Sequence, residues 1–366
     1  MENRNSPSLA RRQHTIPRML LKRFASRAKG GEVYTWQFRR NARPFEANVR
    51  NASVEAQFYG DADNGIEQGL GRIESRHAVV LDEVLKGRDP RDFADELRQL
   101  LWTLAVRTSN FRHNVGDLFR NGIDELADQV DVPTATRMIS EHLKNEFDTM
   151  LDETIAKLPA VQARAFRISL ERRPALRDKF RRLIAMQVEG DNYAFAVQAL
   201  LHLAQKTIDT DALSETSHVR ALQRLGERGY VPESFRPEHW QTLRVPARSV
   251  ILGDGACFAV GDSGPGHMLR FGQDWSEVYL PISHDTVLIA SRVDAPPRLK
   301  IEQINTASAS LSYDQFFAAE NGVEEQSLAQ IIRTRASTLS LPEIQRIVRE
   351  MLAGYPPLQG GSRPAT

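Results

Sequence analysis

The sequence of 366 residues has only one cysteine, Cys257, and no long apolar run. A single cysteine excludes an internal disulfide framework and a zinc site built from cysteines, and it favours a reducing compartment. The first residues contain no apolar stretch of the kind found in secretory signals. The longest apolar stretch, near residues 193–204, is interrupted by Gln198 and His202 and is too short to span a bilayer. We therefore expect a cytoplasmic protein without a membrane partner.

The signature motifs of common catalytic sites are also missing from the sequence. The glycine-containing segment at residues 263–266 has neither the spacing of a P-loop nor that of a dinucleotide-binding loop. The chain contains no nucleophile elbow, zincin motif or kinase motif. Function has to be argued from single polar residues and from the distribution of charge.

Positive charge is concentrated in the N-terminal part of the chain. Residues 1–50 contain twelve Lys or Arg and three acidic residues, whereas the whole chain has a net charge of +1. A basic segment of this kind can bind phosphate groups, although a solvated basic surface is the common alternative. Nucleic acid is therefore a candidate partner, and the candidate contacts are Arg11, Arg12, Arg18, Lys22 and Arg23.

The pattern of apolar residues changes along the chain and divides it into segments. Apolar residues recur at steps of three and four from about residue 63 to 225, which is typical of helices. Short apolar runs separated by turn residues follow from residue 249, which is typical of strands, and two closing helices are expected near 312–320 and 324–353. The resulting segments are a flexible arm (1–12), an N-terminal helix and strand with an extended loop (13–60), a helical region (61–228), a proline-bearing connector (229–248), a β-rich part with closing helices (249–355) and a disordered tail (356–366).

The N-terminal strand, residues 32–38, needs a partner because a single strand is not stable alone. The economical solution is that it docks on the C-terminal strands, with the helices inserted between them in sequence. The sequence thus predicts an α+β fold, in which a large helical bundle is inserted between an N-terminal strand and a C-terminal antiparallel sheet.

Five polar residues are candidates for catalysis: Gln13, His14, Glu74, Arg107 and Asp254. His14, beside Gln13, lies at the edge of the first ordered element, where an imidazole can transfer protons or bond to the backbone. Arg107 ends an apolar helix and needs a carboxylate or phosphate partner there. Asp254, flanked by glycines after an apolar strand, can meet a ligand or form a tight turn.

Two of these residues carry the carboxylates that a divalent metal would need. Glu74 lies on an amphipathic helical stretch and can reach into a cleft, although a surface glutamate is the common alternative. Carboxylate oxygens suit Mg²⁺ and Mn²⁺. We therefore expect Glu74 and Asp254 to be the ligands if the protein uses one of these metals.

These features together resemble a bacterial domain-of-unknown-function family, number 4238. Members of that family open with Gln-His-x-x-Pro and a following Leu-x-x-Phe, present here as Gln13, His14, Pro17, Leu21 and Phe24. The resemblance covers residues 13 to about 320. The family's later Thr-Ser-Asp-Asn-Pro stretch is reduced here to the aspartate, Asp254, within Leu-Gly-Asp-Gly-Ala. The resemblance implies the layout and the polar positions, but no activity.

Three classes of function follow from these residues. The first is a nucleic-acid-directed hydrolase, such as a nuclease or an RNA-targeting toxin or defence effector. In it, His14 would transfer protons, Glu74 and Asp254 would hold metal or activate water, and Arg107 would stabilise phosphoryl charge. The second is a binding module for nucleic acid or protein without catalysis. The third is a hydrolase or transferase for a small molecule, with the same residues in a narrow pocket.

Overall fold

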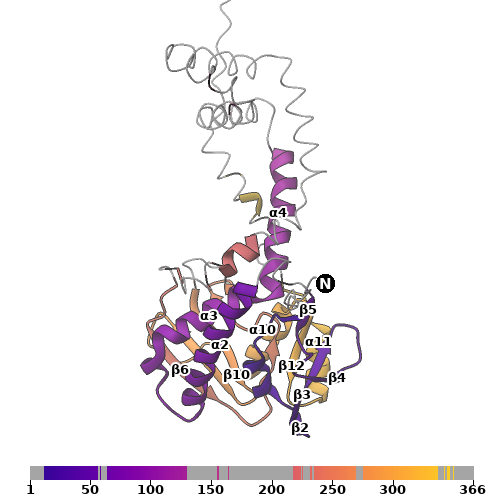
Figure 1. The fold of residues 1–366 in the computed structure, drawn as a ribbon, viewed down its shortest axis with the longest axis vertical. Coiled ribbons are helices and arrows are strands. Elements are labelled where there is room, and N and C mark those ends of the chain that lie inside the picture. Colours follow the sequence, from indigo (N-terminus) through magenta and orange to yellow (C-terminus); the bar gives the residue numbers. More distant parts are fainter. Residues whose placement is uncertain are drawn as a thin grey trace, which may run out of the picture. The chain divides into compact units, whose positions relative to one another are not determined.

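The structure, a computed structural model, describes residues 12–56, 58, 64–129, 155, 164, 217–223, 225, 231–232, 235–268, 275–336, 342, 344–346 and 349. Residues 1–11 of the expected flexible arm, most of the helical region beyond residue 129 and the expected disordered tail lie outside the described residues, whereas Arg12, the last residue of the expected arm, begins a strand. The chain divides into one unit of residues 1–119 and 210–340 and a second unit of residues 120–209 and 341–366. All strands of the described part belong to the first unit, and Figure 1 labels several of them.

The largest antiparallel sheet consists entirely of C-terminal strands. Its order is β6-β11-β10-β8-β9. The bounds are β6 His239–Arg244, β8 Phe258–Gly261, β9 Gly264–Gly266, β10 Trp275–Ser283 and β11 Thr286–Ser291. Every residue of β11, and every residue of β10 except Ser276, is buried. Runs without polar alternation are expected when both faces of a sheet are covered.

The second sheet joins the two ends of the fold. Its order is β2-β3-β12-β7. A further strand, β4, pairs with the residues of β3 from Tyr34 to Gln37. The bounds are β2 Arg27–Lys29, β3 Glu32–Arg39, β4 Phe45–Asn48, β7 Leu252–Gly253 and β12 Gln315–Ala318. The N-terminal strand β3 pairs with β12 in the register Trp36↔Ala318 and Phe38↔Phe316. The N-terminal strand thus shares a sheet with C-terminal strands, and the α+β fold class is confirmed.

A short two-stranded ribbon lies beside these sheets and positions the N-terminal motif. Strand β1 (Arg12–His14) pairs with β5 (Val54–Ala56), which places Gln13 directly opposite Glu55. Directly opposed residues in an antiparallel pair project to the same face. The turn that follows β1 leads into α1 (Arg18–Leu21) and the 3₁₀ turn η1 (Lys22–Phe24).

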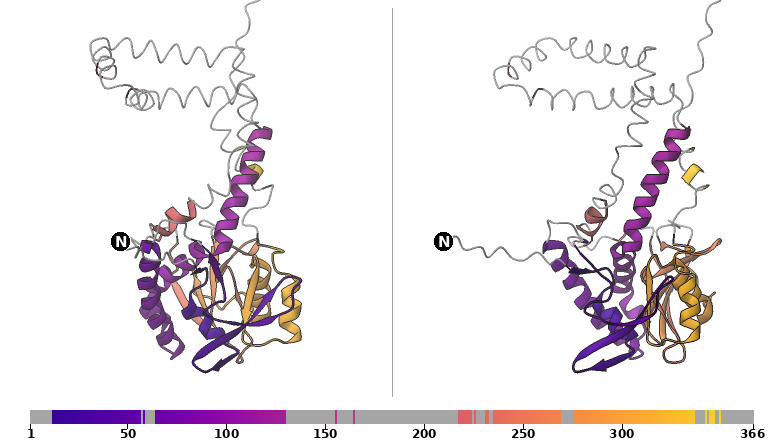
Figure 2. Two further views of the ribbon diagram at one scale, coloured as in Figure 1. Left: turned by 45° about the vertical axis from the view of Figure 1, so that its right-hand side comes forward. Right: turned by 90° about the vertical axis from the view of Figure 1, so that its right-hand side faces the viewer.

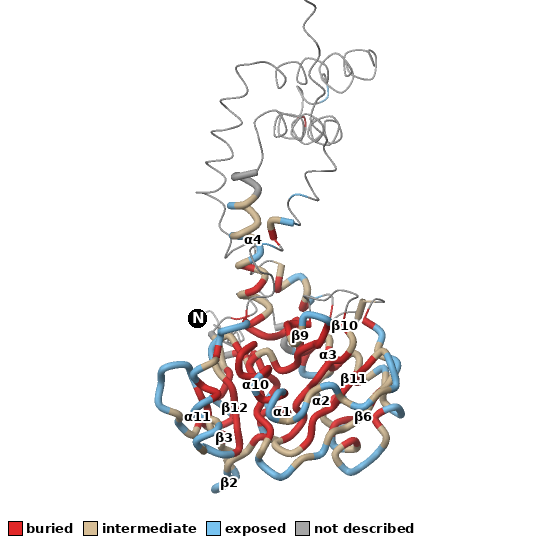
Figure 3. Tube along the Cα trace, turned by 180° about the vertical axis from the view of Figure 1, so that it is seen from behind, coloured by how far each residue is buried: buried red, intermediate tan, exposed pale blue. Residues whose placement is uncertain are grey.

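Helices cover both faces of the β10–β11 pair. Further helices described in the first unit are α2 Asn64–Leu85, α3 Ala94–Arg107 after the 3₁₀ turn η2 Pro90–Phe93, the start of α4 Ser109–Gln129, α10 Ile301–Leu311 and α11 Val323–Gln330. Figure 2 shows the purple helices α2 and α3 on one side of the orange strands. Figure 3 colours much of α3, β10 and β11 as buried.

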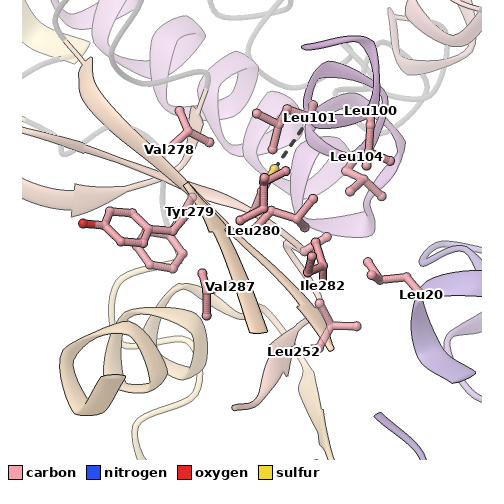
Figure 4. Packing of buried hydrophobic residues seen from close by; sticks show 14 of the residues in the cluster. Leu20, Leu100, Leu101, Leu104, Leu252, Val278, Tyr279, Leu280, Ile282 and Val287 are labelled. Atoms are coloured by element: carbon pink, nitrogen blue, oxygen red, sulfur yellow. Dashed lines mark hydrogen bonds between the residues drawn. The ribbon is translucent and has the colours of Figure 1, made fainter. Parts of the chain in front are cut away.

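The packing around β10 follows the two-residue period of a strand. Val278, Leu280 and Ile282 are buried in one cluster with Leu101 and Leu104 of α3, and Figure 4 shows them on the α3 side of the strand. Tyr279 alternates with these residues and projects to the opposite face in Figure 4. Its hydroxyl donates to Glu277 at 2.5 Å and accepts from the backbone amide of Leu299 at 3.1 Å, just before α10. A buried phenol needs such partners, because an unsatisfied polar group costs free energy.

Several local expectations were wrong. The segment expected as a helix near 312–320 contains strand β12, and the preceding helix α10 was not expected. The last expected helix begins near its place but α11 ends at Gln330. The connector contains β6, and the expected loop of residues 39–60 contains β4 and β5. In the described part of the chain, no helix is long and apolar enough to cross a membrane.

Candidate acid–base site

Three of the predicted site residues meet where α3 ends beside the β1–β5 ribbon. Arg107 is the last residue of α3 and is only 2% exposed. Its Nε and Nη2 atoms donate to the carbonyl oxygen of His14 at 3.1 and 2.9 Å. Its Nη1 atom forms an ion pair with the carboxylate of Glu74 on α2. Because a buried guanidinium is costly without partners, this clamp explains why an apolar helix can end on arginine.

The predicted pair Gln13 and His14 is anchored by its own side chains and backbone. The Nδ1 atom of His14 lies 3.0 Å from the carbonyl oxygen of Ala52, so this nitrogen carries the proton and donates it. Gln13 is buried and lies opposite Glu55 in the ribbon. The contacts of His14 therefore anchor strand β1. Gln13 lies on the face of the ribbon that carries Glu55.

Asp254 belongs to a different hydrogen-bond network from Glu74 and Arg107. Its carboxylate is buried and accepts three backbone amides, from Tyr313 at 2.8 Å, Asp314 at 2.6 Å and Gln315 at 3.0 Å. Burial raises the pKa of Asp254 to about 7, and the three amides oppose that rise. The side chain thus fixes the turn between α10 and β12.

The two carboxylates expected to bind metal each have protein partners. Glu74 pairs with Arg107, whereas Asp254 accepts the three amides of the turn. Among the residues that the structure describes, no group of three or more His, Cys, Asp or Glu side chains could hold a metal ion. The two carboxylates are thus bound to different protein groups, and the structure does not bring Glu74 and Asp254 together as ligands of one Mg²⁺ or Mn²⁺ ion.

The turn fixed by Asp254, the ribbon fixed by Arg107 and the start of α4 together carry a cluster of titratable side chains. Glu55, on β5, accepts a hydrogen bond from the side chain of Ser109, the first residue of α4. Burial raises the pKa of Glu55; the Ser109 hydrogen bond and the charge of Arg112 oppose the rise, and the Asp314 carboxylate adds to it. Arg112, one helical turn after Thr108, also lies over the ring of Phe58, with its Cζ atom 5.6 Å from the centroid.

His113 is the second titratable member of this cluster. Its ring stacks on Tyr313, with centroids 3.8 Å apart and planes 5° from parallel. Arg333 lies against the same tyrosine, with its Cζ atom 3.9 Å from the ring centroid. Burial lowers the pKa of His113; the carboxylates of Asp314 and Asp117 oppose this, and the charges of Arg333 and Arg112 add to it.

The predicted residues and the new cluster form one arrangement. Arg107 holds β1, and β1 pairs with the strand that carries Glu55. Asp254 holds the turn that carries Tyr313, on which His113 stacks. The sequence therefore identified supporting residues, while Glu55 and His113 were missed. The only local signal was a carboxylate between two apolar residues in Val54-Glu55-Ala56, within a segment expected to be a loop.

The predicted nucleic-acid contacts that can be described line a separate groove. Arg11 and the side chain of Arg12 lie outside the described residues. Arg18, Lys22 and Arg23 project from α1 and η1 into a groove of about 660 Å³, opposite Gly71, Glu74, Ser75, Ala78 and Asp82 of α2. Arg23 donates to the carbonyl oxygen of Ala78 at 3.1 Å and pairs with Asp82 at 2.5 Å.

A family model described as "Protein of unknown function (DUF4238)" matches residues 12–319. The match covers most of the chain, and the chain therefore belongs to this family, as the N-terminal motif predicted. No curated protein and no solved structure matches the chain. The family description gives no activity.

Proposed function

We propose that this member of the DUF4238 family cleaves RNA by general acid–base catalysis, with Glu55 and His113 as the catalytic pair. One observation carries the proposal: a partly buried carboxylate and a partly buried imidazole interact with the same Asp314 and Arg112, and the charge of Arg333 also acts on the imidazole. Pairs of titratable groups whose environments shift their pKa values are typical of acid–base sites.

The chemistry needs no group beyond these side chains and the substrate. Glu55 accepts the proton of a ribose 2′-hydroxyl, and the 2′ oxygen attacks the adjacent phosphorus. The bond between phosphorus and the 5′ oxygen breaks, and His113 donates a proton to that leaving oxygen. The products are a 2′,3′-cyclic phosphate and a 5′-hydroxyl end. Arg112 and Arg333 are the cations available to stabilise the charge that develops on the phosphoryl oxygens.

The pKa directions define the expected pH dependence of cleavage. The pKa of Glu55 is raised above 4.5, and that of His113 is lowered below 6.5. The active form holds a carboxylate and an imidazolium together, so it is most populated between the two pKa values. The rate should follow a bell-shaped profile centred midway between the two pKa values, and the profile should be narrower than unshifted pKa values would give, because the two shifts have opposite directions.

The test is cleavage of a labelled single-stranded RNA by the full chain in the presence of a chelator. Glu55→Gln and His113→Ala should each lower the rate by about 10²- to 10⁴-fold. Glu324→Gln removes an exposed carboxylate from α11 and is the matched control, with no change expected. Thermal melting of each variant separates loss of catalysis from loss of fold.

Two outcomes contradict the proposal. One is that the folded wild-type chain leaves RNA intact over the whole pH range. The other is that Glu55→Gln cleaves as fast as Glu324→Gln. Salt-sensitive RNA binding without any cleavage would instead support the alternative of a binding module.

A further inference from the structure

The groove between α1–η1 and α2 has an excess of positive charge that the protein does not neutralise itself. Two of its three cations, Arg18 and Lys22, are exposed, and within the described part of the chain neither side chain has a hydrogen-bond or ion-pair partner. Its third cation, Arg23, is already paired with Asp82. The groove therefore presents two cations to a ligand.

The two acidic side chains that line the groove each form an ion pair with an arginine of the protein. Glu74 gives its carboxylate to Arg107, and Asp82 gives its carboxylate to Arg23. Both contacts turn these carboxylates toward protein cations. An anionic ligand in the groove thus meets Arg18 and Lys22 without competing against an unpaired acid.

The spacing of the two free cations suits a chain of phosphates. Arg18 and Lys22 are four residues apart, so they lie one helical turn apart and line the same groove. Arginine and lysine both bind phosphate, the first through its planar fork and the second as a point charge. The groove volume of about 660 Å³ lies within the range of ligand sites and is open enough for part of a polymer.

The groove is linked to the acid–base site by side-chain contacts. Glu74 lines the groove and pairs with Arg107. Two residues after Arg107, Ser109 donates to Glu55. A strand held in the groove is therefore held by the same elements that position the catalytic carboxylate.

We infer that this groove binds the phosphate backbone of the RNA substrate away from the scissile bond, with Arg18 and Lys22 as its two phosphate contacts. The inference rests on the proposed function for the identity of the polymer. Arg23 is a positioning residue here, because its bonds to Ala78 and Asp82 tie η1 to α2.

The test measures binding of a fluorescein-labelled oligouridylate by anisotropy at increasing KCl, using the full chain with Glu55→Gln to prevent turnover. Each phosphate contact on a single strand contributes about 0.7 to the slope of log affinity against log salt. The double variant Arg18→Ala/Lys22→Ala should therefore lower the slope by about 1.4, and weaken binding about 25-fold at roughly 0.1 M salt relative to 1 M.

The matched control removes two exposed arginines from the turn between β3 and β4, Arg40→Ala/Arg43→Ala. An equal loss in both double variants would show a general effect of net charge and would overturn the inference. So would an unchanged slope in Arg18→Ala/Lys22→Ala. Competition by polyglutamate as strong as by RNA would assign the groove to an acidic protein and would also overturn it.

The same measurements separate this inference from the proposed function. If wild-type protein does not cleave RNA but the groove variant loses its salt-dependent binding, the groove inference stands and the catalytic proposal fails. If wild-type protein cleaves RNA and the groove variant keeps its slope and KM, the catalytic proposal stands and the groove inference fails.

Discussion

Replacing Arg107 should destabilise the protein more than replacing any exposed arginine, because its guanidinium joins three elements. Arg107→Leu keeps most of the side-chain volume but removes both hydrogen bonds to the His14 carbonyl oxygen and the ion pair with Glu74. Breaking a buried ion pair by removing one partner costs about 3–5 kcal/mol. The Glu74 side chain is 21% exposed and can be partly hydrated, which puts the expected loss near the lower end, about 3 kcal/mol.

Glu74→Gln should cost less, about 1–2 kcal/mol, because Arg107 keeps both bonds to His14 and an amide oxygen to donate to. The double variant Arg107→Leu/Glu74→Gln should lose less than the sum of the single variants, since no orphaned carboxylate remains. Urea unfolding followed by tryptophan fluorescence gives the free energies, and Trp102 on the same helix reports locally. Arg72→Leu, at an exposed position of α2, is the control. A loss in Arg107→Leu as small as in that control would refute the reasoning.

Asp254→Asn should lower stability by at least about 2 kcal/mol, because an amide nitrogen would face backbone donors that now bond to a carboxylate oxygen; an unchanged melting curve would contradict this. Stability should also fall on acidification from pH 6.5, because burial lowers the pKa of His77 and His267 to about 4 and of His218 to about 3, so unfolding takes up three protons. Asp254 has the opposite effect, because its pKa is raised to about 7 in the folded protein. Between pH 3.8 and 7 the folded state holds a proton on Asp254 that unfolding releases. The remaining two protons give a slope of roughly 3 kcal/mol per pH unit near pH 5, and urea midpoints that rise on acidification would contradict it.

The strands that were predicted well are those whose sequence alone decides their state. Thr286–Ser291 and the middle of Trp275–Ser283 are short, mainly apolar runs that contain β-branched or aromatic residues, and both are strands buried on two faces. Gln315–Ala318 was expected as a helix because a short Phe-Phe-Ala-Ala run fits either period. Its partner β3 lies about 280 residues earlier in the chain, and that pairing decides its state.

The candidate site was predictable only as far as single residues demanded partners. Arg107 at the end of an apolar helix required a carboxylate, and the structure supplies Glu74. Asp254 was expected at a site or in a tight turn. Asp254 and Gly255 do lie in a turn, in which the backbone amide of Ala256 donates to the carbonyl oxygen of Gly253 at 2.9 Å, and the Asp254 carboxylate also holds a second turn sixty residues later. Glu55 and His113 share Asp314 and Arg112 as charged neighbours only because β5, α4 and that turn converge, which no local pattern in the sequence records.

The identity of the cleavage products tests the central claim most directly. Mass spectrometry of a single-stranded RNA treated with the wild-type chain should show 2′,3′-cyclic phosphate and 5′-hydroxyl ends, and a 2′-deoxy substitution at one nucleotide should protect the bond that follows it. Ends carrying 5′-phosphate and 3′-hydroxyl, or cleavage after the deoxynucleotide, would contradict attack by the 2′ oxygen under the control of Glu55 and His113.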